Sequence, residues 1–113
     1  MNPKLLPMIC FIFTLGLTST VMAKGSEVSK SIYVCDGNNI MEVVYINTNQ
    51  GNSYAIINQA NEMIPMKLMK MASGANYEAT DKDYSYKLYT KGKTADLVER
   101  NDKPVLSNCT SDK

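Results

Sequence analysis

The chain has 113 residues with twelve basic and eleven acidic side chains, a net charge of +1, and no histidine. Lysines alternate with acidic residues instead of forming the basic stripe that nucleic-acid binding needs, so we expect no nucleic-acid partner. Without histidine the commonest general base and metal ligand are missing, and no phosphate-binding or metal-binding motif is present. We therefore expect neither an enzyme nor a protein with a metal or cofactor site.

The first 23 residues have the pattern of a secretory signal. A lysine near the start precedes an apolar stretch from Leu5 to Leu17, and the segment ends in Val21-Met22-Ala23. The apolar stretch is shorter than the roughly 20 residues that a membrane-spanning helix needs, so we predict that residues 1–23 are a cleaved signal peptide. Lys24 follows the predicted cleavage point, where a lipoprotein would need cysteine, so we expect no membrane anchor. Residues 24–113 are expected to form a single domain.

Two of the three cysteines, Cys35 and Cys109, remain after removal of the signal, because Cys10 lies within it. An even pair in an exported chain predicts a disulfide bond between them. The alternative is a reactive or metal-binding pair, which no histidine or further cysteine supports. A domain of about 90 residues has a small core, so such a bridge is expected to matter for stability.

From Ser31 onward, short segments rich in Val, Ile and Tyr alternate with polar clusters, which is typical of an antiparallel sandwich or barrel. We expect eight strands, near residues 31–35, 40–47, 53–58, 63–71, 76–80, 84–90, 94–100 and 104–106. Eight strands can close into a barrel that side chains fill, and closure removes exposed sheet edges. The predicted fold is all-β: a small eight-stranded antiparallel barrel, or a flattened barrel or sandwich, closed by one disulfide.

Alternation along the strands predicts which side chains face the interior. The inward positions are Met41, Val43 and Tyr45, then Tyr84, Tyr86 and Leu88, then Ala95 and Leu97. Residues 24–30 and 110–113 show no such pattern, and we expect them to be loose tails.

Two glycine-centred turns stand out, in Ser73-Gly74-Ala75-Asn76-Tyr77 and in Tyr89-Thr90-Lys91-Gly92. In each, glycine lets the backbone turn tightly beside a polar or cationic side chain. Together with the segment Tyr33-Val34-Cys35 before them and Cys109 after them, these motifs resemble the MliC/PliC family of periplasmic or membrane-bound inhibitors of c-type lysozyme.

The resemblance implies an eight-stranded barrel that inserts two loops into the lysozyme cleft. Ser73 and Lys91 would reach the catalytic carboxylates, Gly74 and Gly92 would shape the turns, and Tyr77 would pack against its loop and brace it. We choose Lys91 over Lys87 because Lys91 precedes the glycine of the motif. The resemblance therefore implies an inhibitor located in the periplasm, with c-type lysozyme as its partner.

Two other functions remain open at the level of the sequence. One is a small exported barrel that binds an apolar or sugar ligand inside, although large inward Tyr and Met side chains leave little room for one. The other is a purely structural protein of the cell envelope.

Overall fold

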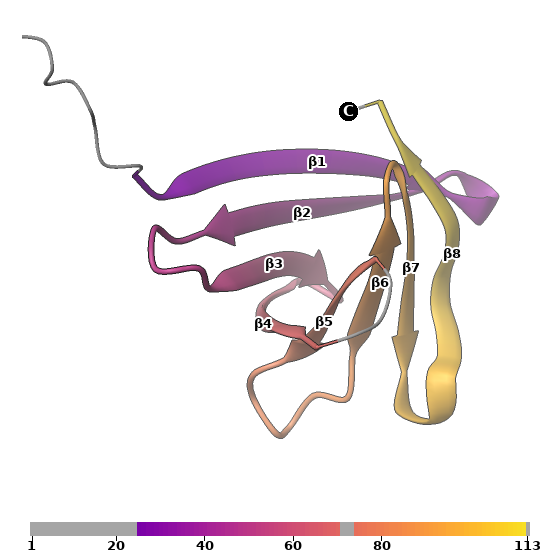
Figure 1. Ribbon diagram of the computed structural model, residues 1–113. Coiled ribbons are helices and arrows are strands. Elements are labelled where there is room, and N and C mark those ends of the chain that lie inside the picture. Colours follow the sequence, from indigo (N-terminus) through magenta and orange to yellow (C-terminus); the bar gives the residue numbers. More distant parts are fainter. Residues whose placement is uncertain (1–24, 71–73, 113) are drawn as a thin grey trace, which may run out of the picture.

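Eight antiparallel strands form a closed barrel in the computed structural model, which describes residues 25–70 and 74–112 (Figure 1). The strands are β1 (Glu27–Cys35), β2 (Asn39–Asn47), β3 (Ser53–Gln59), β4 (Glu62–Met69), β5 (Ala75–Ala79), β6 (Lys87–Lys91), β7 (Thr94–Glu99) and β8 (Lys103–Ser111). Each strand pairs with the next along the chain, and β1 pairs with β8 to complete the ring. The predicted fold class is confirmed.

Two short 3-10 segments connect strands at the ends of hairpins. Segment η3 (Asp36–Asn38) joins β1 to β2, and η4 (Arg100–Asp102) joins β7 to β8. The described residues contain no helix long and apolar enough to cross a membrane. The predicted signal peptide, residues 1–23, lies outside the part of the chain that the structure describes.

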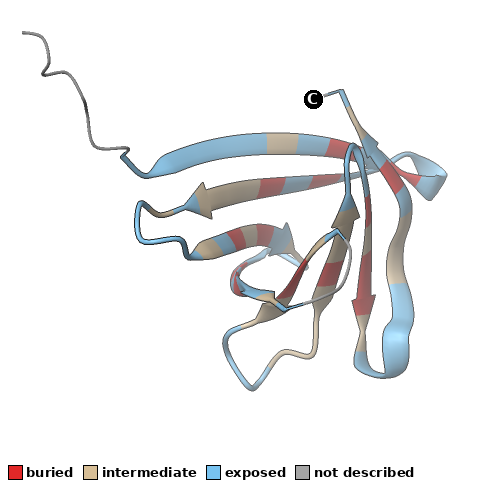
Figure 2. Ribbon diagram, viewed as in Figure 1, coloured by how far each residue is buried: buried red, intermediate tan, exposed pale blue. Residues whose placement is uncertain are grey.

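Buried residues alternate with more exposed ones along several strands (Figure 2), and the buried side chains form a hydrophobic cluster inside the barrel. Along β2, Met41 and Val43 are buried and Glu42 is exposed, as the alternation predicts. The largest fully buried side chains are those of Met41, Ile57, Ile64, Met66, Leu88, Leu97 and Val43, together with Cys109. This packing stabilises the barrel because it removes apolar surface from water.

The second predicted inward set, Tyr84, Tyr86 and Leu88, lies only partly on a strand. Leu88 is fully buried on β6, but β6 begins at Lys87, so Tyr84 and Tyr86 belong to the preceding loop. A turn forms there, in which the backbone N–H of Tyr84 donates to the carbonyl oxygen of Asp81 at 3.1 Å. The two rings still pack against the core and stack with centroids 6.1 Å apart. The predicted strand, residues 84–90, therefore began too early, because Tyr84 and Tyr86 pack against the core although they lie in a loop.

Both predicted tails contain strand. β1 begins at Glu27, which pairs with Asn47, although residues 27–30 are all exposed. Backbone pairing with β2 orders this segment, and no buried side chain marks it in the sequence. β8 extends to Ser111 and contains Asn108, whose positive φ of 53° interrupts the regular extended backbone.

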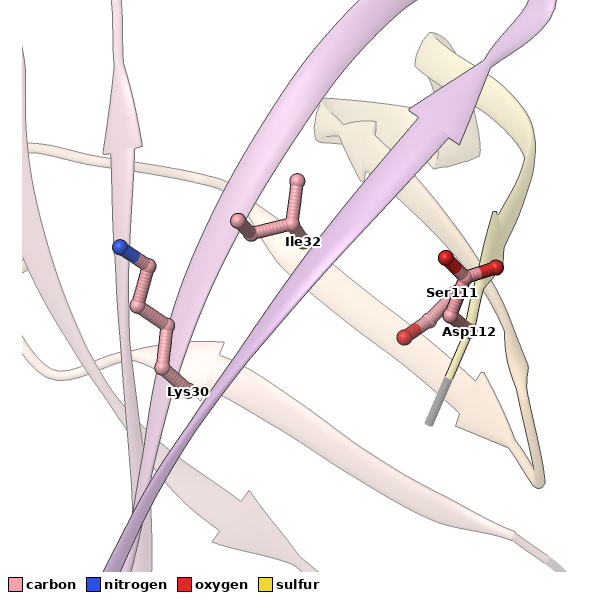
Figure 3. A pocket seen from close by; sticks show the side chains of 4 residues that line it. All are labelled: Lys30, Ile32, Ser111 and Asp112. Atoms are coloured by element: carbon pink, nitrogen blue, oxygen red, sulfur yellow. The ribbon is translucent and has the colours of Figure 1, made fainter.

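The seam between β1 and β8 is the shortest ladder of the ring. It consists of the pairs Tyr33 with Ser111 and Val34 with Thr110. The predicted disulfide between Cys35 and Cys109 is present beside these pairs, so a covalent bond reinforces the narrowest junction. Beyond them the strands diverge around a shallow hollow of about 330 Å³, lined by Lys30, Ile32, Ser111 and Asp112 (Figure 3).

Candidate functional site

The two glycine-centred turns lie side by side at one end of the β5–β6 ladder. β5 begins at Ala75, one residue after Gly74, and β6 ends at Lys91. The register pairs Ala75 with Thr90, so the segments flanking the two turns are direct neighbours (Figure 1). Ser73 lies outside the described residues, but it is bonded to Gly74, which is described.

Gly74 allows this close approach. Its φ of +70° lies in the region that L side chains rarely adopt, and a β-carbon at this position would overlap the carbonyl oxygen of Thr90. Only a residue without a side chain fits between the two strands here. The glycine of the first motif is therefore required by the contact between the turns.

The second turn presents Lys91 to solvent. Gly92 and Lys93 form a two-residue hairpin loop between the paired residues Lys91 and Thr94. Gly92 has a φ of +59°, whereas Lys93 is not among the residues with positive φ, a pattern typical of a type II′ turn. The Thr94 hydroxyl donates to the carbonyl oxygen of Lys91 at 2.9 Å and fixes the base of the loop.

The ammonium group of Lys91 is available to a partner. Lys91 is exposed, and the ion pairs found within residues 25–70 and 74–112 are Lys30 with Glu42 and Lys103 with Glu99. Lys87 lies at the opposite end of β6, paired with Glu78 and Val98. Four residues along a strand correspond to about 13 Å, so Lys91 is the β6 lysine that adjoins Gly74.

Tyr77 faces the barrel interior and not the surface of the turns. Its side chain is buried, and its ring lies 5.7 Å from the ring of Tyr45, measured between centroids. Burial raises the pKa of Tyr77, with a smaller contribution from Tyr33. The position suits a residue that supports the first turn from inside the barrel.

Four polar residues near the turns, Asn76, Tyr89, Asp96 and Asp102, were given no role in the sequence analysis. Asn76 is buried, and its side-chain oxygen accepts a hydrogen bond from the backbone N–H of Thr90 at 3.3 Å. The hydroxyl of Tyr89 donates to Asp102 at 2.9 Å, and this bond is the main cause of the raised pKa of Tyr89. Asp96 accepts from the backbone N–H of Asn108 at 2.9 Å.

These groups border one open hollow beside the two turns. It measures about 500 Å³ and is lined by Gly74, Asn76, Tyr89, Thr90, Lys91, Thr94, Asp96 and Asp102. Asn76 was given no role there, because only the β5–β6 register, which the sequence does not specify, identifies its partner. No cluster of His, Cys, Asp and Glu that could hold a metal ion occurs in the described segments.

The fold and the paired turns define a small disulfide-closed β-barrel with two glycine-centred turns side by side at one end. The family described as membrane-bound lysozyme-inhibitor of c-type lysozyme (MliC) matches residues 33–106, and the chain belongs to that family. Its relatives of known structure are inhibitor proteins, which confirms the expectation that the chain is not an enzyme.

Two solved structures show the relationship. PliC-St, a periplasmic inhibitor of c-type lysozyme from Salmonella typhimurium, is 70% identical in sequence to this chain and superposes with a TM-score of 0.71. The match covers 75% of this chain and 98% of that chain. MliC from Pseudomonas aeruginosa, solved in complex with hen egg white lysozyme, shares the fold at 23% identity and a TM-score of 0.62, covering 98% of this chain and 97% of that chain. No match was found among curated protein sequences.

Proposed function

We propose that this protein inhibits c-type lysozyme by inserting the Ser73 turn and the Lys91 turn into the active-site cleft. The observation that carries the proposal is the pairing of Ala75 with Thr90, which sets the two turns side by side at one end of the barrel. Membership of the inhibitor family supports the target class. The interior is packed with core side chains, so interior ligand binding has no comparable support.

The chemistry of the target explains why these residue types would inhibit it. A lysozyme holds two carboxyl groups across its cleft, one kept protonated by its apolar surroundings and the other ionised. The exposed ammonium of Lys91 is suited to pair with a carboxylate, and the Ser73 hydroxyl can donate or accept a hydrogen bond. A protein turn offers no glycosidic bond, so the enzyme would be occupied without reacting.

The relatives also indicate where the protein acts. The Salmonella relative is periplasmic, and the Pseudomonas relative was solved bound to a c-type lysozyme. We infer the periplasm for this protein, reached by export and cleavage of residues 1–23. Lys24 at the predicted cleavage point favours a form without a lipid anchor.

The test is whether purified residues 24–113 inhibit a c-type lysozyme. Lysozyme activity is measured as the rate at which a bacterial cell suspension clears. Loss of one partner of a desolvated charge pair costs about 2–5 kcal/mol, so we expect Lys91→Ala to weaken inhibition roughly 30-fold or more. We expect a smaller loss for Ser73→Ala, because only a neutral hydroxyl is removed.

Two control variants remove the same charge elsewhere. Lys93→Ala changes an exposed lysine of the same loop, and Lys87→Ala changes the lysine at the far end of β6. We expect both to inhibit nearly as well as the wild type. Damage by Lys87→Ala with a silent Lys91→Ala would show that the second turn is assigned to the wrong lysine. No inhibition by the wild type would refute the function itself.

A further inference from the structure

Thr90 bonds to the first turn through both its backbone and its side chain. Its backbone N–H donates to the Asn76 side-chain oxygen at 3.3 Å, and its hydroxyl donates to the carbonyl oxygen of Ala75. Its own carbonyl oxygen lies against Gly74. Thr90 immediately precedes Lys91, so a single residue joins the base of the second turn to the first.

Asn76, on β5, is the partner that accepts the hydrogen bond from the Thr90 backbone. Its exposed fraction is 7%, and among the residues that the structure describes it is the one buried polar residue, lining the hollow beside the turns. Its side-chain oxygen would lie 3.7 Å from a β-carbon at position 74, so it sits next to Gly74 as well as to Thr90. A buried amide is retained only where its hydrogen bonds are made, because an unsatisfied polar group is costly in the interior.

We propose that Thr90 and Asn76 are positioning residues that hold the two turns at a fixed separation before the target arrives. The inference deepens the proposed function and rests on it. Both residues line the hollow beside the turns, but their side-chain oxygens bond within the protein: that of Asn76 accepts from the Thr90 N–H, and the Thr90 hydroxyl donates to Ala75. Binding is tighter when loops are ordered in advance, because less conformational freedom is lost in the complex.

Thr90→Val is the sharpest variant, since it keeps the branched shape and removes the hydroxyl, and Thr90→Ser restores the hydroxyl. We expect Thr90→Val to raise the dissociation constant for a c-type lysozyme about 3- to 10-fold, the size expected for one lost hydrogen bond, and Thr90→Ser to recover the loss. Equal affinities of Thr90→Val and the wild type would overturn the proposal.

A double-mutant cycle separates positioning from general stability. If Thr90 acts by placing Lys91, the effect of Thr90→Val on affinity should shrink when Lys91 is already alanine. A loss that stays the same in the Lys91→Ala background would assign Thr90 a merely structural role and refute the proposal. Thermal unfolding of each variant shows that the compared proteins are folded.

The contacts by which Thr90 and Asn76 hold the two turns together form a clamp. A measurement without lysozyme tests this clamp independently of the proposed function. NMR relaxation of the backbone amides should show Gly74 and Lys91 ordered in the free wild type, and both more mobile in Thr90→Val on the nanosecond timescale. Unchanged order at both positions would refute the clamp. Joint loosening in a protein that fails to inhibit lysozyme would support the clamp and refute the proposed function.

Discussion

The hydroxyl groups of Tyr33 and Tyr45 lie 2.8 Å apart inside the barrel, where they hydrogen-bond to each other. The ring of Tyr45 also contacts that of Tyr77. Burial, followed by the bond to Tyr33, raises the pKa of Tyr45 well above its usual range. Three tyrosines from β1, β2 and β5 thus share one part of the interior.

We predict that the protein loses stability in alkali. The folded-state pKa values of Tyr45 and Tyr77 are raised, so their contribution is complete below the unfolded value of about 10 and is lost as pH rises through the folded values. Between the unfolded and the folded pKa, the free energy of unfolding should fall by at most about 1.4 kcal/mol per pH unit for each tyrosine. Urea unfolding across this range, in parallel with tyrosinate absorbance, measures it. Tyr45→Phe should have a shallower slope, and equal slopes would contradict the assignment.

We predict that reduction of the Cys35–Cys109 bond strongly destabilises the domain. The two cysteines are 74 residues apart in the sequence, and closing a loop of this length contributes about 4 kcal/mol in the chain-entropy model. Urea unfolding with and without reductant gives the difference. A thiol assay under denaturing, non-reducing conditions should find no free thiol in the mature protein; two reactive thiols would rule out the bridge.

We predict different costs for alanine at the two turn glycines. A β-carbon at Gly92 meets no atom within 4 Å, so Gly92→Ala should cost only the backbone strain of its positive φ, roughly 1–3 kcal/mol. At Gly74 backbone strain is joined by overlap with the Thr90 carbonyl, so Gly74→Ala should cost about 1–3 kcal/mol more than Gly92→Ala. Thermal unfolding compares the pair, and equal melting temperatures would mean that the two turns are not in contact.

We predict that inhibition weakens as pH falls. The acid carboxyl of a c-type lysozyme has a free pKa of about 6, and the Lys91 ammonium beside it should depress that pKa in the complex. A carboxyl group whose pKa is depressed on binding contributes fully to affinity at a pH above its pKa in free lysozyme. That contribution fades as pH falls through about 6. Calorimetry between about pH 7 and pH 4 should show weaker binding in acid and a flatter trend for Lys91→Ala. Binding that tightened on acidification would place Lys91 elsewhere.

We predict that the β3–β4 hairpin can be improved. Its two loop residues, Ala60 and Asn61, have φ values of 54° and 64° between the paired residues Gln59 and Glu62. Positive φ at both positions favours Asn and Gly, so Ala60→Asn should raise the free energy of unfolding by about 0.5–1 kcal/mol. Ala60→Val should lower it, because a branched side chain fits positive φ poorly. Stabilisation by valine would contradict the backbone conformation.

Much of the fold follows from alternation in the sequence. Met41 and Val43 on β2, and Ala95 and Leu97 on β7, mark inward faces because polar residues separate them. The start of β1 gives no such signal, since Glu27 and its neighbours pair through the backbone and bury no side chain. The prediction of strand boundaries from sequence therefore fails where a segment pairs through its backbone without burying side chains.

The candidate site is predictable only in part, for a related reason. The motifs identify Gly74, Lys91 and Gly92 because a tight turn needs glycine. The roles of Asn76 and Thr90 arise from the register of two strands, which brings together residues that are 14 positions apart. A sequence pattern that describes each turn separately does not contain that relationship.

The order of the strands has a consequence for how the chain folds. Every ladder except β1–β8 joins strands that follow one another along the chain, so each can form from nearby residues. Only the last ladder must bring the two ends together, and it contains two residue pairs. We therefore expect the hairpins to form first and to bring Cys35 and Cys109 together for oxidation. In the oxidising compartment to which we propose the chain is exported, oxidation of the two cysteines would then lock the ring in its closed form.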